Sequence, residues 1–129
     1  MNTTQAYSKE HHPPAAVFDI YLSVPDTYNW HGPFPALLDS GADVTIIPMS
    51  LIATLRVPAI DEIALISQWH DRHVMRLFQV DIQIAGLLFP AVDVVSDRWS
   101  KEVLLGRNVL NRLDLRLEGP KLHTHVLRK

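Results

Sequence analysis

One apolar run in the first half of the sequence is interrupted abruptly by the three residues Asp39, Ser40 and Gly41. Residues 34–38 lead into this interruption, and residues 44–47 resume with branched apolar side chains. Aspartate, serine and glycine are favoured in turns, because the first two bond their own backbone and glycine accepts unusual dihedral angles. The pattern predicts two short strands joined by a tight loop that holds one carboxylate close to the backbone.

Much of the remaining chain alternates apolar and polar residues with the period of two that is typical of β-strands. The segments with this pattern are residues 17–24, 62–68, 74–84, 89–95, 113–117 and 122–127, the last as an edge strand. Residues 62–68 and 74–84 are expected to be the arms of a hairpin. Residues 108–113 predict the one helix, with Asn108 as its N-cap, whereas residues 49–55 fit either a helical turn or a strand. Many short strands and one short helix indicate an all-β fold.

The length of 129 residues predicts one domain, which we place at residues 15–129. The polar residues 1–14 end in His-His-Pro-Pro and are expected to form a disordered N-terminal arm. The hydrophobic content of 47% is enough for one modest core, to which a second copy could add. Trp30, Trp69 and Trp99 are interpreted as core or interface side chains, because no basic groove accompanies them.

The composition excludes several classes of function. A formal net charge of −2 provides no basic surface for nucleic acid or for a membrane. The chain has no cysteine and therefore no disulfide or thiolate metal site. No signal sequence or apolar span is recognisable, which predicts a cytoplasmic protein. The histidine pairs His70/His73 and His123/His125 lack a third ligand, so we predict no metal and no cofactor.

A second motif lies far downstream, where residues 102–110 read Glu-Val-Leu-Leu-Gly-Arg-Asn-Val-Leu. Together, residues 36–48 and 102–117 resemble the two signature segments of the retropepsins, the retroviral-type aspartic proteases. Their active-site loop reads Asp-Thr/Ser-Gly-Ala, and an apolar-apolar-Gly-Arg-Asn/Asp segment closes their fold. The resemblance implies a homodimeric aspartic endopeptidase with a closed, barrel-like sheet and a flap hairpin, acting on peptide or protein substrates.

The resemblance also assigns roles within the first motif. Asp39 of each of two chains would share one proton and activate water, since like charges held close together cannot both ionise, as in aspartic proteases generally. The hydroxyl of Ser40 would bond to the partner's loop, and Gly41 would allow close approach of backbone. Ala42 would leave room for an extended substrate, and Asp43 would present its amide and side chain to the substrate backbone.

Three further residues complete the site that the resemblance implies. Gly106 would let the closing strand pack tightly against the catalytic loop. Arg107 would pair with Asp43 in the same chain through its planar guanidinium. Trp69 would lie near the tip of the flap hairpin, residues 62–81, where it would contact substrate. That tip lacks the glycines that are usual in retroviral flaps.

Other interpretations remain open from the sequence alone. Asp-Ser-Gly is also ordinary turn chemistry, and Arg107 could be a simple surface cation. A retropepsin fold could also serve as a non-catalytic dimerisation or peptide-binding module. In either case, residues 15–24 and 113–127 are expected to build part of a dimer interface.

Overall fold

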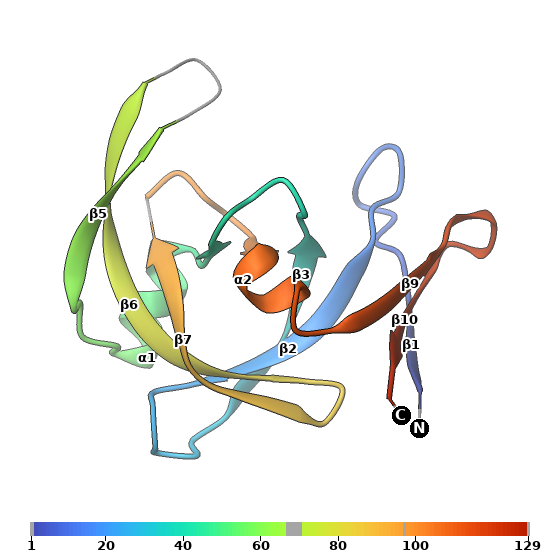
Figure 1. The fold of residues 1–129 in the computed structure, drawn as a ribbon, viewed down its shortest axis with the longest axis horizontal. Coiled ribbons are helices and arrows are strands. Elements are labelled where there is room, and N and C mark those ends of the chain that lie inside the picture. Colours follow the sequence, from blue (N-terminus) through green and yellow to red (C-terminus); the bar gives the residue numbers. More distant parts are fainter. Residues whose placement is uncertain (1, 67–70, 97, 129) are drawn as a thin grey trace.

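The computed structural model describes residues 2–66, 71–96 and 98–128, and β-strands dominate it (Figure 1). The strands are β1 (Thr3–Ala6), β2 (Val17–Ser23), β3 (His31–Leu38), β4 (Thr45–Ile46), β5 (Asp61–Ile66), β6 (Arg72–Ile84), β7 (Leu87–Ser96), β8 (Val103–Leu105), β9 (Asp114–Glu118) and β10 (His123–Leu127). The helical segments are α1 (Met49–Leu55), α2 (Arg107–Leu110) and the short 3-10 turn η1 (Gly119–Lys121). The predicted all-β class is confirmed.

Six of these strands close into a barrel in the order β2, β3, β8, β4, β7, β6, and pairing between β2 and β6 completes the ring. Alternation along each strand turns every second side chain inward, as the pleat of a strand requires. The inward side chains with no or almost no exposure include Ile20, Leu22, Val80, Ile82, Val94 and Leu105. Closure leaves these strands without a free edge and gives the chain one core.

The predicted hairpin is formed by β5 and β6 and projects from the barrel at the upper left of Figure 1. The pairing runs from Asp61 opposite Leu77 to Ile66 opposite Arg72. Beyond the hairpin, β6 continues into the barrel, where it pairs with both β7 and β2. The hairpin is therefore a direct extension of a barrel strand. Trp69, which we predicted at its tip, lies outside the described residues.

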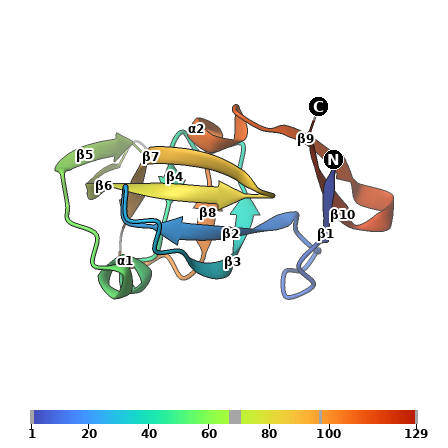
Figure 2. The same cartoon turned by 90° about the horizontal axis from the view of Figure 1, so that it is seen from below.

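A second sheet holds both ends of the chain, with strand order β1, β10, β9 (Figure 2). The prediction of a disordered arm over residues 1–14 is corrected here, because β1 pairs with β10 and Ser8 bridges to Ala15. Residues 3–6 read Thr-Thr-Gln-Ala and carry no apolar alternation, so the strand depends on a partner far along the chain. The prediction of β10 as an edge strand is also corrected, since β10 is the central strand.

One face of this terminal sheet is linked by polar side chains from all three strands. The Thr4 hydroxyl lies 2.7 Å from Nδ1 of His125, and Nε2 of His125 lies 3.0 Å from the Glu118 carboxylate. The hydrogen bond from His125, assisted by Lys121 and Arg116, lowers the pKa of Glu118 below its ordinary value of 4.5. A lowered carboxyl pKa stabilises the fold above the ordinary value, and this contribution is lost as pH falls through the lowered one.

The segment that the sequence left undecided, residues 49–55, forms the seven-residue helix α1. Pro48 precedes the helix, and Arg56 ends it in the left-handed conformation, with its amide bonded back to Ala53. Ile52 and Leu55 are buried against the barrel. No helix that the structure describes is both long and apolar enough to cross a membrane.

The predicted helix at residues 108–113 is shorter and begins earlier than expected. It is the single turn α2, and Gly106 instead of Asn108 occupies the N-cap position. The prediction of Asn108 as a cap is wrong because its side chain has other partners, which are described with the site below.

A buried carboxylate fixes two turns of the barrel. Asp81 in β6 is only 4% exposed. One of its carboxylate oxygens accepts the amide of Asp26 at 3.1 Å, and the other accepts the amide of Ala91 at 2.8 Å. These bonds connect β6 to the turn after β2 and to the irregular part of β7. Asp81 is therefore a buried polar anchor that joins three parts of the barrel.

We expect Asp81→Ala to lower the free energy of unfolding by about 2–4 kcal/mol, because two amides lose their acceptor. Asp93→Ala is the matched control, since Asp93 is exposed and its carboxylate accepts one bond, from the side chain of Gln79. Urea unfolding followed by circular dichroism measures both. Equal losses in the two variants would contradict the anchoring role of Asp81.

Candidate active site

The Asp-Ser-Gly loop connects β3 to β4 and is shaped by its own backbone. The Asp39 amide donates to the carbonyl of Leu105 at 3.0 Å, which ties the loop to the end of β8. The Asp39 carboxylate accepts the Gly41 amide at 3.0 Å, and the Asp39 carbonyl accepts the Ala42 amide at 3.2 Å. The carboxylate is therefore held at a fixed place on a tight turn, as the sequence predicted.

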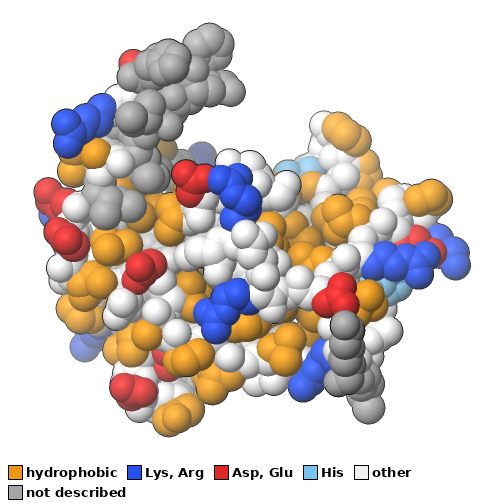
Figure 3. All heavy atoms as spheres, viewed as in Figure 1, with side chains coloured by type: hydrophobic (Ala, Val, Ile, Leu, Met, Phe, Trp, Pro, Cys, Tyr) orange, Lys and Arg blue, Asp and Glu red, His pale blue; other side chains and the backbone are white. Residues whose placement is uncertain are grey.

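This loop lies at an open edge of the molecule. Asp39 is partly exposed, and Ser40 and Gly41 are exposed. Figure 3 shows the molecule hollowed between the β5–β6 hairpin on one side and the N-terminal segment before β2 on the other. Among the described residues, the hydrogen bonds of the Asp39 carboxylate involve the Gly41 amide and no second carboxylate. The loop therefore presents the Asp39 carboxylate, partly exposed, toward solvent.

Arg107 spans the loop from the other motif. Its guanidinium donates to the carbonyl of Ser40 at 2.7 Å and forms an ion pair with the Asp43 carboxylate. Its backbone amide donates to the carbonyl of Ala42 at 2.8 Å. The structure thus brings Arg107 and Asp43 together. Their side chains are 42% and 79% exposed, so the ion pair alone is expected to add little to stability.

A second connection, buried beneath the loop, was not anticipated from the sequence. The hydroxyl of Thr45, which is completely buried, donates to the side-chain oxygen of Asn108 at 2.9 Å and accepts the Gly106 amide at 3.1 Å. The side-chain amide of Asn108 donates to the carbonyl of Asp93 at 2.8 Å. Asn108 therefore joins α2 to β4 and β7, while Thr45 also holds the turn before α2. The available signal was the asparagine directly after Gly-Arg.

The two motifs approach each other most closely at Gly106. A Cβ atom at this position would lie 2.5 Å from both the carbonyl carbon and the carbonyl oxygen of Val44. Real Cβ contacts are never that short, and a backbone neighbour cannot rotate away. Gly106 is thus required by close packing, as the sequence analysis expected.

Other sequence-based expectations lie partly outside the described residues. Trp69 and His70 lie outside the described residues, and Trp99 is 78% exposed, which rules out the core and leaves the interface as the predicted alternative. His125 has partners in Thr4 and Glu118. In the described ranges, no group of three or more His, Asp or Glu residues is arranged as a metal site.

Comparisons with known proteins connect this geometry to one fold. No family model matches the sequence, and no curated protein matches it. A crystal structure of a retropepsin-like aspartic protease from Rickettsia conorii matches with a TM-score of 0.61 and 13% identity, over 98% of this chain and 90% of that one. EIAV protease in complex with the inhibitor HBY-793 matches with a TM-score of 0.55 and 19% identity, over 76% and 86%. The solution structure of simian foamy virus protease matches at 0.53 and 14%, over 74% and 92%. The chain has the retropepsin fold.

We expect Gly106→Ala to lower the free energy of unfolding by about 1–3 kcal/mol, because the added methyl group collides with the Val44 carbonyl. Gly119→Ala is the control, since an added Cβ atom there would meet nothing within 4 Å. Thermal unfolding followed by circular dichroism measures the difference. If both variants melt at the wild-type temperature, the close approach at Gly106 is not a packing constraint.

Proposed function

We propose that this chain is one subunit of a homodimeric aspartic endopeptidase. The observation that carries the proposal is the Asp39 loop, held by Arg107 and the buried Asn108–Thr45 connection within a retropepsin fold. A loop fixed at both its rim and its base is suited to hold a catalytic group in one place, which is how enzymes lower the barrier to reaction by orientation.

The reaction follows from two such carboxylates at close range. One Asp39 is ionised and takes a proton from water, while the Asp39 of a second copy stays protonated and polarises the scissile carbonyl. The two carboxylates would share one proton, because ionisation of both would place like charges together. The Gly41 amide already donates to the carboxylate and would help to hold its negative form.

The remaining predicted residues have supporting roles in this proposal. Ser40 is exposed at the tip of the loop, where its hydroxyl could reach a second copy. Ala42 and Asp43 would contact the substrate backbone, and Trp69 would contact substrate from the hairpin. The terminal sheet is the proposed site of dimerisation, since β9 is an edge strand with Leu117 58% exposed.

Replacement of the catalytic carboxylate tests the function. Denatured casein is incubated with the wild-type protein and with Asp39→Asn at roughly pH 4 to 7, the range in which paired aspartates share a proton. We expect the wild type to cleave casein and Asp39→Asn to be inactive, with equal melting temperatures. A protein that binds casein without cutting it would instead be a peptide-binding module. Cleavage by both proteins would show that Asp39 is not catalytic.

We expect Arg107→Lys to reduce activity and weaken the dimer while changing the free energy of unfolding by less than about 1 kcal/mol, because the ion pair is exposed. A single ammonium cannot hold the Ser40 carbonyl and Asp43 with the geometry of a guanidinium. A buried ion pair would lose more stability on such a change, but the pair of Arg107 and Asp43 is exposed. Arg56→Lys, at the exposed end of α1, is the control. Sedimentation at several concentrations gives the dimer dissociation constants. If wild type and Arg107→Lys have identical constants and identical activity, Arg107 is an ordinary surface charge without a role in the loop.

A further inference from the structure

The segment between β7 and β8 carries an aromatic side chain that is largely exposed. Trp99 is 78% exposed, and the Arg98 guanidinium lies 5.4 Å from the centre of its ring. Tryptophan is costly to expose and is enriched where proteins bind partners. The contact with Arg98 also demonstrates that a cation can occupy a face of this ring. Most of the indole is therefore at the surface, where it can line a binding site.

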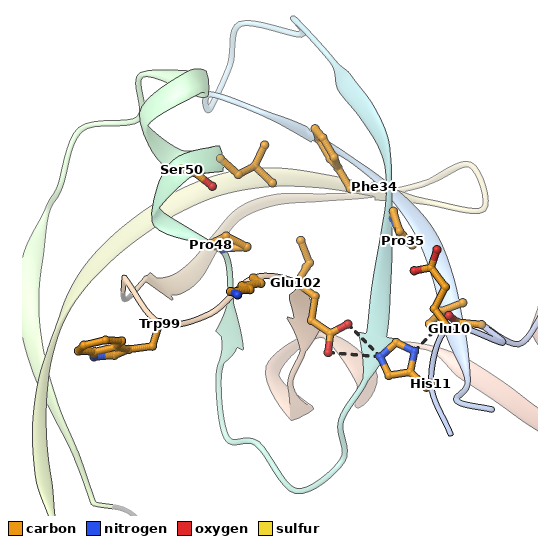
Figure 4. Close-up of a pocket in the computed structure, with 13 residues that line it drawn as sticks. Glu10, His11, Phe34, Pro35, Pro48, Ser50, Trp99 and Glu102 are labelled. Carbon is orange, nitrogen blue, oxygen red and sulfur yellow. Dashed lines mark hydrogen bonds and ion pairs between the residues drawn. The ribbon is translucent and has the colours of Figure 1, made fainter. Parts of the chain in front are cut away.

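Trp99 lines a cavity of about 740 Å³ between α1, β3 and the N-terminal segment (Figure 4). Its walls are largely apolar and include Phe34, Pro35 and Leu51. Its charged groups gather at one end, where Figure 4 shows Glu102 and His11 pointing toward each other. The cavity thus combines an apolar channel with a polar end. We call it the Glu102 cavity.

The polar end keeps negative charge available. Nε2 of His11 lies 3.0 Å from the Glu102 carboxylate, and Nδ1 lies 3.1 Å from the Ser8 hydroxyl. A neutral imidazole satisfies both contacts when Nε2 donates to Glu102 and Nδ1 accepts from Ser8. Glu102 remains 47% exposed and has further acceptor positions, and Glu10 adds a second carboxylate to the lining.

Among the described residues of the lining, Lys101 is the one lysine or arginine. Two carboxylates against one ammonium leave the described lining with an excess of one carboxylate, His11 counted apart. Apolar walls that end in carboxylates match a side chain with a long apolar stem and a cationic head, because such side chains bury the stem and keep the head in contact with polar groups. The exposed indole of Trp99 adds a surface that also favours a cation.

The cavity lies within reach of the proposed catalytic loop. Glu102 directly precedes β8, and Leu105 at the end of β8 accepts the Asp39 amide. Three residues of extended strand span about 10 Å. A peptide residue about three positions from a bond cleaved at Asp39 could therefore reach as far as Glu102.

We propose that the Glu102 cavity is a substrate subsite that receives an arginine or lysine side chain. This inference rests on the proposed peptidase function and specifies its substrate class. The carboxylate of Glu102 holds the cationic head, and the apolar walls hold the stem. His11 limits the charge available to the substrate, because it shares the same carboxylate.

Pools of quenched octapeptides test the subsite. Each pool fixes one position as arginine or as citrulline, its neutral isostere, and randomises the others. We expect the wild type to prefer arginine about fivefold to tenfold at one position within about three residues of the cleaved bond. Glu102→Gln should abolish this preference. His11→Ala should retain or increase it, since Glu102 loses its competing partner.

The two variants separate recognition from support. If His11 and Glu102 only clasp the N-terminal segment, Glu102→Gln and His11→Ala change cleavage in the same way, and the inference fails. Asp26→Asn, a charge change on an exposed turn far from the cavity, should behave as the wild type does. A similar loss of preference in this control would also overturn the inference, because any lost negative charge would then suffice.

The same pools distinguish this inference from the function on which it depends. Equal cleavage of arginine and citrulline pools by the wild type would leave the peptidase function in place and remove the subsite. Absence of cleavage in every pool would contradict the peptidase function itself and the subsite with it.

Discussion

The close approach of Gly106 to the Val44 carbonyl is the constraint on which the site depends. The parallel pairing of β3 with β8 brings the end of one motif beside the end of the other. The loop from β3 can turn back into β4 only if the chain after β8 passes directly over it. A side chain at Gly106 would prevent that crossing. The closure of the barrel and the position of the Asp39 loop therefore depend on the same close contact.

Two sets of polar contacts then hold the chain after β8 in one position over the Asp39 loop. Beneath the loop, Thr45 and Asn108 satisfy each other in a buried setting, where an unpaired polar group would be costly. At the rim, Arg107 contacts the Ser40 carbonyl and Asp43 in a setting open to water. The buried connection is suited to stabilise the crossing, whereas the exposed one is suited to orient the loop. Loss of the buried connection is therefore expected to lower mainly stability. Loss of the exposed connection is expected to lower mainly activity.

The parts of the structure that the sequence predicts are those that depend on residues close together in the chain. The Asp39 turn and the β5–β6 hairpin carry their signals in neighbouring residues, and the structure has them where they were expected. The strand β1 has no such signal, because its pairing comes from β10 at the other end of the chain. Asn108 was misread as a helix cap, since its real partners come from β4 and β7.

The terminal sheet also has a consequence for the order in which the chain can fold. Thr3 pairs with Val126, so β1 is synthesised well before the strand with which it pairs. The barrel strands lie between them in sequence and can assemble earlier, while β1 has no partner. Pairings between such distant segments form slowly, and an unpaired strand is open to pairing with other chains in the meantime. During synthesis, β1 of one copy and β10 of another are therefore free to meet.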